Sequence, residues 1–217
     1  MIDQYINRII NADCLDILRQ LPDKCIDLVL TDPPYGIGVD KMTMFDGAKK
    51  QKRHKEYADI SPSADVFKQI FRVSKNQIIF GGNYFADMLS PSRGWIVWDK
   101  KVNEKIAPYF SDCELAWTSF DRNIKKYTLG WYGVEGINNR EESKIHPTQK
   151  PLPLFQWCLE NYSKEGDLIL DCFSGSGTTA VACHNLHRRF ICIEKDPDYY
   201  RASVERLEKV QAQPLLF

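Results

Sequence analysis

Residues 167–186 read DLILDCFSGSGTTAVACHNL and constrain the fold more than any other stretch of the chain. An apolar strand ends at Asp171, and a glycine-rich turn then opens a helix. The turn matches the pattern G-x-G-x-x-G/A, in which glycines let the backbone approach a ligand at the N-terminus of a helix. It lacks the lysine of a phosphate-binding P-loop, so triphosphate binding is not expected. The stretch predicts a strand–turn–helix unit of an α/β domain.

A second strand, in RRFICIEKD, follows this helix and ends at Glu194, nineteen residues after Gly175. A carboxylate at this place suits the two hydroxyls of a ribose, so we expect a nucleoside cofactor at the turn. The motif by itself fits a nicotinamide cofactor as well. A tight turn that binds no ligand is the structural alternative.

Short apolar runs alternate with amphipathic segments along the whole chain, which is typical of an α/β domain. The expected strands are 27–31, 77–81, 95–98, 113–118, 167–171 and 189–193, with a shorter one near 6–10. The expected helices are 14–21, 64–73, 152–162, 178–186 and 198–210. The 217 residues, 43% of them hydrophobic, are enough for one core, so we expect a single domain over 1–217.

The strand that ends at Thr31 leads into the sequence LTDPPYGIG, residues 30–38. Both prolines fix their own φ and bias the preceding residue toward extended geometry, so Asp32 and the carbonyl of Pro33 are held rigidly. Together with the glycine turn, this strand end resembles the DNA amino-methyltransferases that use S-adenosylmethionine. Further segments similar to that family are NADCLDIL (11–18), IIFGGNYF (78–85), WIVWDK (95–100), CELAW (113–117) and HPTQKP (146–151).

The Asp-Pro-Pro-Tyr motif precedes the cofactor glycines in the chain, as in the permuted group called the beta class. The resemblance implies a Rossmann-like, seven-stranded mixed sheet with helices on both faces, in circularly permuted methyltransferase order. It also implies a catalytic role for the tetrapeptide. Its members are Asp32, Pro33, Pro34 and Tyr35.

The exocyclic amino nitrogen of adenine or cytosine is a poor nucleophile, because its lone pair is delocalised into the ring. Asp32 and the Pro33 carbonyl would each accept one N–H, and the carboxylate would stabilise the positive charge that develops during direct transfer. Tyr35 would stack on the base after it leaves the duplex. Four aromatic residues are the candidates for a second ring that stacks on the base, and the sequence does not choose among them. These are Tyr109, Phe110, Trp117 and Phe120.

The resemblance also implies which residues bind S-adenosylmethionine. Asp13, beside Cys14, would accept from the adenine amino group, and Glu194 would bind the ribose. Thr148 and Lys150 would close over the cofactor's carboxylate. Residues along its methionine end and sugar would be Asp171, Phe173, Gly175, Ser176, Gly177, Thr178 and Thr179. We expect no metal.

Two irregular stretches, about 37–62 and 119–147, are too long for ordinary connections, and we expect them to contact double-stranded DNA. The expected DNA-binding residues are Lys49, Lys50, Lys52, Arg53, Lys55, Arg122, Lys125 and Lys126. A solvated, mobile loop is the alternative for the basic run. The formal net charge is zero, so any DNA contact depends on such local patches. The stretch 119–147 is short for a separate DNA-recognition domain, so we expect a short or relaxed target site. We also expect no built-in nuclease.

In the family that the chain resembles, an aspartate before the two prolines usually accompanies adenine-N6 methylation and a serine accompanies cytosine-N4 methylation, so Asp32 favours adenine. Cytosine-N4 methylation is the alternative. Two alternatives are more remote. A nicotinamide-dependent oxidoreductase leaves Asp-Pro-Pro-Tyr unexplained. An inactive DNA-binding protein is expected to have lost Asp32 or the glycines of the turn, and both are present.

The seven cysteines show no CxxC spacing and no disulfide framework, and no apolar run suits a membrane span. We expect a protein of the cytoplasm of a bacterial or phage-infected cell, either solitary or paired with a restriction nuclease. The oligomeric state stays open, with a homodimer among the alternatives. The end of the chain, QPLLF, resembles peptides that dock on sliding clamps through Gln213, Leu216 and Phe217; a frayed or core-covering tail is the alternative.

Overall fold

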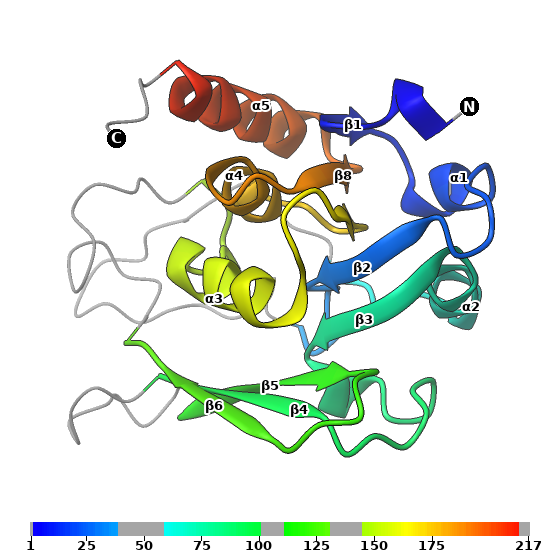
Figure 1. Ribbon diagram of the computed structural model, residues 1–217, viewed down its shortest axis with the longest axis vertical. Coiled ribbons are helices and arrows are strands. Elements are labelled where there is room, and N and C mark those ends of the chain that lie inside the picture. The colour runs from blue at the N-terminus through cyan, green and yellow to red at the C-terminus, as the bar shows by residue number, and fades with distance from the viewer. Residues whose placement is uncertain (1, 39–58, 101–110, 131–144, 213–217) are drawn as a thin grey trace.

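A computed structural model describes residues 2–38, 59–100, 111–130 and 145–212, which form one mixed sheet with helices on both faces (Figure 1). Its strands are β1 (Arg8–Asn11), β2 (Ile26–Thr31), β3 (Ser74–Phe80), β4 (Trp95–Asp99), β5 (Cys113–Thr118), β6 (Lys125–Thr128), β7 (Leu168–Asp171) and β8 (Arg189–Glu194). Their order in space is β1-β8-β7-β2-β3-β5-β4-β6. The first five are parallel, and β5 runs antiparallel to both of its neighbours.

The sheet has eight strands in the described part of the chain, rather than the seven expected. The additional strand, β6, lies at the edge of the sheet, pairs only with β4, and falls inside the stretch 119–147 that was expected to be irregular. Its sequence KKYT is mostly exposed, with only Tyr127 half-buried against Trp157. An edge strand with one apolar side chain gives no hydrophobic pattern that sequence reasoning can detect.

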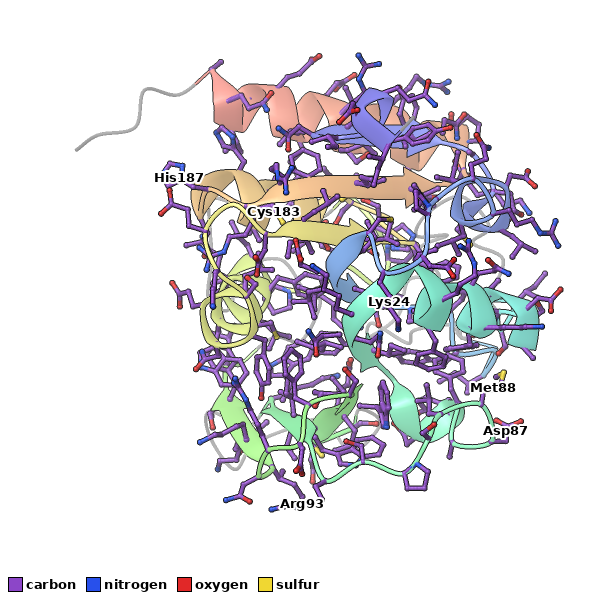
Figure 2. The ribbon with its side chains drawn as sticks, turned by 45° about the vertical axis from the view of Figure 1, so that its right-hand side comes forward. Lys24, Asp87, Met88, Arg93, Cys183 and His187 are labelled. Carbon is purple, nitrogen blue, oxygen red and sulfur yellow. The ribbon has the colours of Figure 1, made fainter. Side chains whose placement is uncertain are left out.

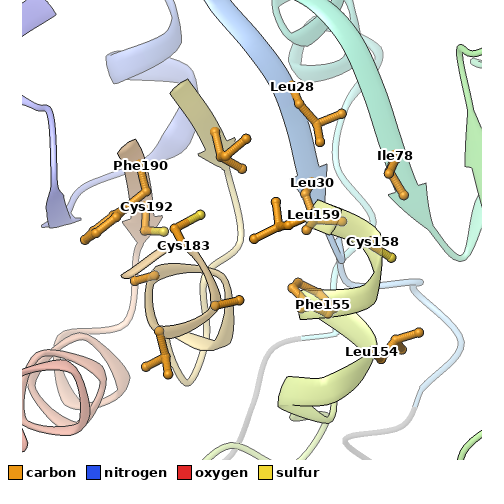
Figure 3. Close-up of a cluster of buried hydrophobic side chains, with 14 of the residues drawn as sticks. Leu28, Leu30, Ile78, Leu154, Phe155, Cys158, Leu159, Cys183, Phe190 and Cys192 are labelled. Carbon is orange, nitrogen blue, oxygen red and sulfur yellow. The ribbon is translucent and has the colours of Figure 1, made fainter. Parts of the chain in front are cut away.

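The helices divide between the two faces of the sheet (Figure 1). One face carries α3 (Leu152–Tyr162), α4 (Thr178–Asn185) and α5 (Pro197–Gln211), and the other carries α1 (Cys14–Leu18) and α2 (Ala64–Val73). Figure 3 shows the first of these layers, where Phe155 and Leu159 of α3 face Leu28 and Leu30 of β2. The expected α/β architecture with helices on both faces is confirmed.

Local sequence explains where these helices lie. In α2 the buried residues Val66, Phe67, Ile70 and Val73 recur at helical spacing and form one apolar stripe. At the C-terminal end of α2, the side chain of Lys24 donates to the carbonyls of Phe71 and Ser74. Asp87 and Arg93 lie at the surface (Figure 2). No helix in the described ranges is long and apolar enough to cross a membrane.

The connections out of β2 and β7 form a topological switch point at the carboxyl ends of these strands, and we call the region beside it the crevice. These strands are parallel neighbours, but β2 continues through α2 to β3, whereas β7 continues through α4 on the opposite face to β8. The chain therefore departs in opposite directions on either side of the β2–β7 pair, and such a switch point is where open α/β sheets bind ligands. Asp32 and the glycine turn follow these two strands directly.

Candidate active site

The glycine turn lies between β7 and α4 and adopts a conformation that requires glycine. Gly175 and Gly177 have φ values of 51° and 75°, in the left-handed region, and Gly177 caps α4. The carboxylate of Glu194 accepts from the Gly175 N–H at 2.7 Å and from the Asp196 N–H at 2.8 Å. Burial raises the pKa of Glu194, against the lowering effect of these two hydrogen bonds. The end of β8 is thus fixed to the turn.

Asp171, the last residue of β7, joins the two sides of the switch point. Its carboxylate accepts from the Thr31 hydroxyl at 2.7 Å, from the Phe173 N–H at 3.1 Å and from the Thr179 hydroxyl of α4. The side chain is buried, and burial raises the pKa of Asp171 to about 6 even though the hydroxyls oppose the shift. Both carboxylate oxygens therefore serve to connect β2, β7 and α4.

The HPTQKP segment crosses the crevice from the glycine turn to the end of β2. Its Lys150 carbonyl accepts from the Thr178 hydroxyl of α4 at 3.3 Å. His146 is buried, packs edge-on against Tyr199 at 4.3 Å between ring centroids, and lies 3.1 Å from the Thr148 hydroxyl through Nδ1. These contacts give His146 a structural role, and the segment carries the side chain of Lys150 to the end of β2.

Four side chains meet at the end of β2, and we call them the Asp32 cluster: Asp32, Tyr35, Glu114 and Lys150. Lys150 Nζ lies 2.6 Å from Asp32 Oδ2 and 3.1 Å from Glu114 Oε2. The Tyr35 hydroxyl donates to Asp32 Oδ1 at 2.7 Å. Both oxygens of Asp32 are thus hydrogen-bonded, one to a cation and one to a phenol.

Charge and burial shift the pKa values within the Asp32 cluster in different directions. Burial raises the pKa of Asp32, against the lowering effect of Lys150. Burial also favours the neutral form of Glu114, but Lys150 and Lys100 outweigh it and hold the pKa of Glu114 at about 2. The pKa of Lys150 lies above its usual value, because its two carboxylates outweigh its burial. Lys150 and Glu114 are therefore both charged near neutral pH.

Two aromatic rings stand beside the cluster. Tyr35 stacks on Tyr84 with ring centroids 4.8 Å apart and an angle of 21° between planes, and Tyr84 is 43% exposed. Gly81, with φ of 67°, lies so close that an added Cβ would be 2.1 Å from the Tyr35 ring. The turn after β3 thus positions Tyr35, and Tyr84 presents an aromatic surface to solvent at the crevice.

Comparisons with known proteins agree with this geometry. The family model described as DNA methylase, of the N6 and N4 type, matches residues 96–205, which is more than half of the chain. The chain belongs to this DNA methylase family. The methylase is also 28% identical to the type II methyltransferase M.HpaI of Haemophilus parainfluenzae over 238 residues, covering 93% of the chain and 74% of that relative.

Solved structures share the fold of this methylase. The complex of M1.HpyAVI with S-adenosylmethionine has a TM-score of 0.61 and 24% identity, and the match covers 92% of the methylase and 99% of that chain. The PvuII DNA methyltransferase, which is cytosine-N4-specific, has a TM-score of 0.62 and 17% identity, with 94% and 89% covered. At these identities the likeness concerns the fold.

The structure places the residues expected to bind the cofactor along one edge of the methylase. Asp13 caps α1 by accepting from the Leu15 N–H at 3.0 Å, and it pairs with Lys195, which lowers the pKa of Asp13. Cys14 is buried, and burial raises the pKa of its thiol to about 12. Asn11 donates to the Glu194 carbonyl at 2.9 Å, so Asp13 lies near the end of β8. Lys150, which was also expected to bind the cofactor, instead pairs with Asp32 and Glu114 in the Asp32 cluster.

The residues expected to bind DNA divide into two groups. Arg122 is exposed but donates to the Asn161 carbonyl, and its guanidinium lies over the rings of Phe120 and Tyr162. Lys125 and Lys126 are exposed on β6, and Lys126 pairs with Asp99 at 3.2 Å. The other five lie outside the described residues: Lys49, Lys50, Lys52, Arg53 and Lys55.

Sequence reasoning missed Glu114 and Tyr84. Of the rings considered as a partner of Tyr35, Trp117 is buried with Nε1 bonded to the Ser90 carbonyl, and Phe120 packs against Tyr162. Tyr109 and Phe110 lie outside the described residues. Both missed residues stand in segments already noted, CELAW and IIFGGNYF. A signal for Glu114 was available, because a carboxylate at the start of a strand antiparallel to β3 must lie at the edge where the parallel strands end.

Proposed function

We propose that this methylase transfers a methyl group from S-adenosylmethionine to the N6 amino group of an adenine flipped out of double-stranded DNA. The observation that carries the proposal is the position of Asp32 within the Asp32 cluster, at the switch point beside the glycine turn. A preorganised, largely buried carboxylate is what amino methylation requires, because it stabilises charge as that charge develops on nitrogen.

The described residues fit a nucleoside cofactor at the glycine turn. Gly175 and Gly177 hold the backbone in a form that admits a close ligand, and the half-buried Phe173 and Glu194 stand at the ends of adjacent strands β7 and β8. S-adenosylmethionine bound there supplies the activated methyl group. We assign Asp13, Cys14 and Glu194 to its nucleoside end. The assignment to its methionine end comprises Thr148, Asp171, Phe173, Gly175, Ser176, Gly177, Thr178 and Thr179.

Asp32 and Pro33 act on the nucleophile. The carboxylate accepts one N–H of the target amino group and the Pro33 carbonyl accepts the other, which draws the nitrogen lone pair out of conjugation with the ring. Pro33 is buried, and Pro34 follows it directly, so the chain fixes both acceptors before the base arrives. The proton lost after transfer goes to solvent.

Tyr35 and Tyr84 supply an aromatic surface for the extruded base. Extrusion costs a few kcal/mol in stacking and pairing, and stacking on an aromatic ring returns about 1–3 kcal/mol. Tyr35 is held by Gly81 and Asp32, while the outer face of Tyr84 is accessible. The two stacked rings therefore act as one platform.

The choice of adenine rests on Asp32 at the first position of the tetrapeptide. Cytosine-N4 methylation is the second candidate, since both amino groups offer the same two donors. Incubation with unmethylated duplex DNA and methyl-labelled S-adenosylmethionine, followed by nucleoside mass spectrometry, tests the proposal. We expect labelled N6-methyladenine; N4-methylcytosine would establish the second candidate, and no methylated base despite cofactor binding would contradict the proposal.

Two finer proposals concern the setting of the reaction. We assign Lys125 and Lys126, with the basic run at 49–55, to the DNA backbone in the cytoplasm of a bacterial or phage-infected cell. The tail residues Gln213, Leu216 and Phe217 lie outside the described residues, and we retain them as a clamp-docking peptide. Pull-down by a bacterial sliding clamp should be lost on deletion of 213–217; unchanged pull-down would contradict this.

A further inference from the structure

Lys150 is hydrogen-bonded to the Asp32 carboxylate, which is the acceptor that the amino group of the target base needs. Its ammonium donates to Asp32 Oδ2 at 2.6 Å, as the amino group of the base would do during methyl transfer. A cation at this position competes with the base for the carboxylate. It also opposes the positive charge that develops on the nitrogen, because like charges at such distances repel strongly in a partly buried site. Displacement of Lys150 from Asp32 would therefore favour binding of the amino group and methyl transfer.

Glu114 provides a second carboxylate for Lys150 without a large movement. Its Oε2 lies 3.1 Å from Lys150 Nζ, and its Oε1 pairs with Lys100 of the segment after β4. Because Glu114 stands on β5 and Asp32 follows β2, the lysine lies between two independently held carboxylates. The Tyr35 hydroxyl, 3.3 Å from Nζ, offers a further acceptor on the same side.

We propose that Glu114 is a positioning residue, which retains Lys150 when the target base displaces it from Asp32. This inference rests on the proposed function and deepens it. In the free enzyme Lys150 compensates the buried charge of Asp32, whose side chain is only 15% exposed, and so keeps it ready. When the base arrives, Glu114 holds the lysine, and Asp32 becomes free to accept from the amino group.

The test is a double-mutant cycle on the full chain with Glu114→Gln and Lys150→Gln. In E114Q the lysine loses its second carboxylate and is held by Asp32, so it competes with the base, and we expect kcat/KM for DNA to fall on the order of tenfold, mainly through KM. In K150Q the two carboxylates repel each other, and activity falls as well. The double variant has neither the competitor nor the extra anion, so its activity should exceed that of E114Q, although it stays below wild type because Asp32 lacks the compensating charge of Lys150.

Controls separate this effect from misfolding and from cofactor binding. Asp27→Asn removes another lysine-paired carboxylate, 2.7 Å from Lys75 at the opposite edge of the sheet, and should leave kcat/KM within about twofold. The Kd for S-adenosylmethionine should be unchanged in E114Q. If E114Q does not fold, Glu114→Asp replaces it in the cycle, because it withdraws the carboxylate by one methylene.

Three results would overturn the inference. The first is an additive cycle, in which the double variant is worse than either single variant. The second is an E114Q protein that methylates DNA normally. The third is a K150Q protein whose main defect is weaker cofactor binding, which would assign Lys150 to the cofactor's carboxylate. A wild-type protein that methylates no DNA is a separate result, because it refutes the proposed function itself and the inference with it.

Discussion

The two sides of the crevice are built by different forces. On the β7–β8 side, the glycine turn is held by backbone conformation and by hydrogen bonds from N–H and hydroxyl groups to Asp171 and Glu194. On the β2–β3 side, the Asp32 cluster brings two carboxylates together with Lys150. The first side can hold a ligand without changing its own charges, whereas the second must rearrange its charges when a ligand arrives.

From this difference we expect mutations on the two sides to affect different steps of the reaction. Changes of backbone geometry at the glycine turn should weaken cofactor binding, and changes in the Asp32 cluster should impair methyl transfer with the cofactor still bound. Asp171 lies between them, since it accepts hydrogen bonds from Thr31 on one side and from Phe173 and Thr179 on the other. Variants on each side test whether cofactor binding and methyl transfer can be impaired separately.

Among the glycine variants, Gly81→Ala should have the largest effect, and it should fall on methyl transfer. The added Cβ would lie 2.1 Å from the Tyr35 ring in a left-handed backbone, so Tyr35 must move away from Asp32. Strain and overpacking together cost roughly 2–5 kcal/mol, and we expect kcat/KM for DNA to fall at least about 100-fold while cofactor binding persists. Steady-state kinetics with calorimetric cofactor binding would measure both.

Gly166→Ala is the matched control for Gly81→Ala. Gly166 has φ of 81°, but apart from its two chain neighbours no atom of the described residues lies within 4 Å of an added Cβ, so alanine there introduces the same backbone strain without a clash. Gly166→Ala should lose about 1–2 kcal/mol of unfolding free energy and retain activity. Equal losses of activity in the two variants would show that strain alone, rather than the position of Tyr35, explains the effect.

Asp171 should make stability depend on pH. Because the pKa of Asp171 is raised to about 6, the folded state binds more protons than the unfolded state between the ordinary pKa near 3.8 and 6. Its contribution is therefore greatest below this window and is lost as pH rises through it, by at most about 3 kcal/mol. Urea unfolding of wild type and Asp171→Asn from pH 4 to pH 7 would measure the change.

The stability advantage of wild type over Asp171→Asn should shrink as pH rises from 4 to 7. A difference independent of pH would mean that Asp171 keeps an ordinary pKa despite its burial. It would then act through hydrogen-bond geometry alone, and the link that it forms between the two sides would not depend on its charge.

Gly177→Ala should have a smaller effect on activity than Gly81→Ala, and that effect should be confined to the cofactor side. Its φ is 75°, and the added Cβ would lie 3.0 Å from Ser203 Cβ of α5 and 3.4 Å from Ile9. We expect backbone strain of about 1–2 kcal/mol, which should weaken the Kd for S-adenosylmethionine roughly tenfold. The value of kcat at saturating cofactor should change little. A fall in kcat with unchanged cofactor affinity would break the proposed separation of the two sides.

Most of the fold could be predicted from the sequence, because buried parallel strands are apolar runs and the helices carry regular apolar stripes. The helices over 64–73 and 152–162 have the expected bounds. The exposed strand β6 could not be predicted, since an edge strand with one inward side chain has no apolar pattern. Its stability comes from pairing with β4, a contact that local sequence does not contain.

The candidate site was predictable where it follows from motifs and unpredictable where it depends on tertiary contacts. Asp32 and the glycine turn lie at the same edge of the sheet, as strand-end logic requires. The interaction of Lys150 with Asp32 joins residues 118 positions apart. The order of the motifs in the sequence does not show whether that lysine reaches the carboxylate or the cofactor, because both lie at the same crevice.

The role of the Asp32 carboxylate is tested by the turnover of Asp32→Ala, with Asp32→Asn as an isosteric companion and cofactor affinity measured in parallel. We predict that methyl transfer to DNA falls by about 10³-fold in Asp32→Ala, since it loses the acceptor on which charge stabilisation depends, while S-adenosylmethionine still binds within about threefold. Normal turnover in Asp32→Ala would contradict the central claim that this carboxylate activates the target amino group.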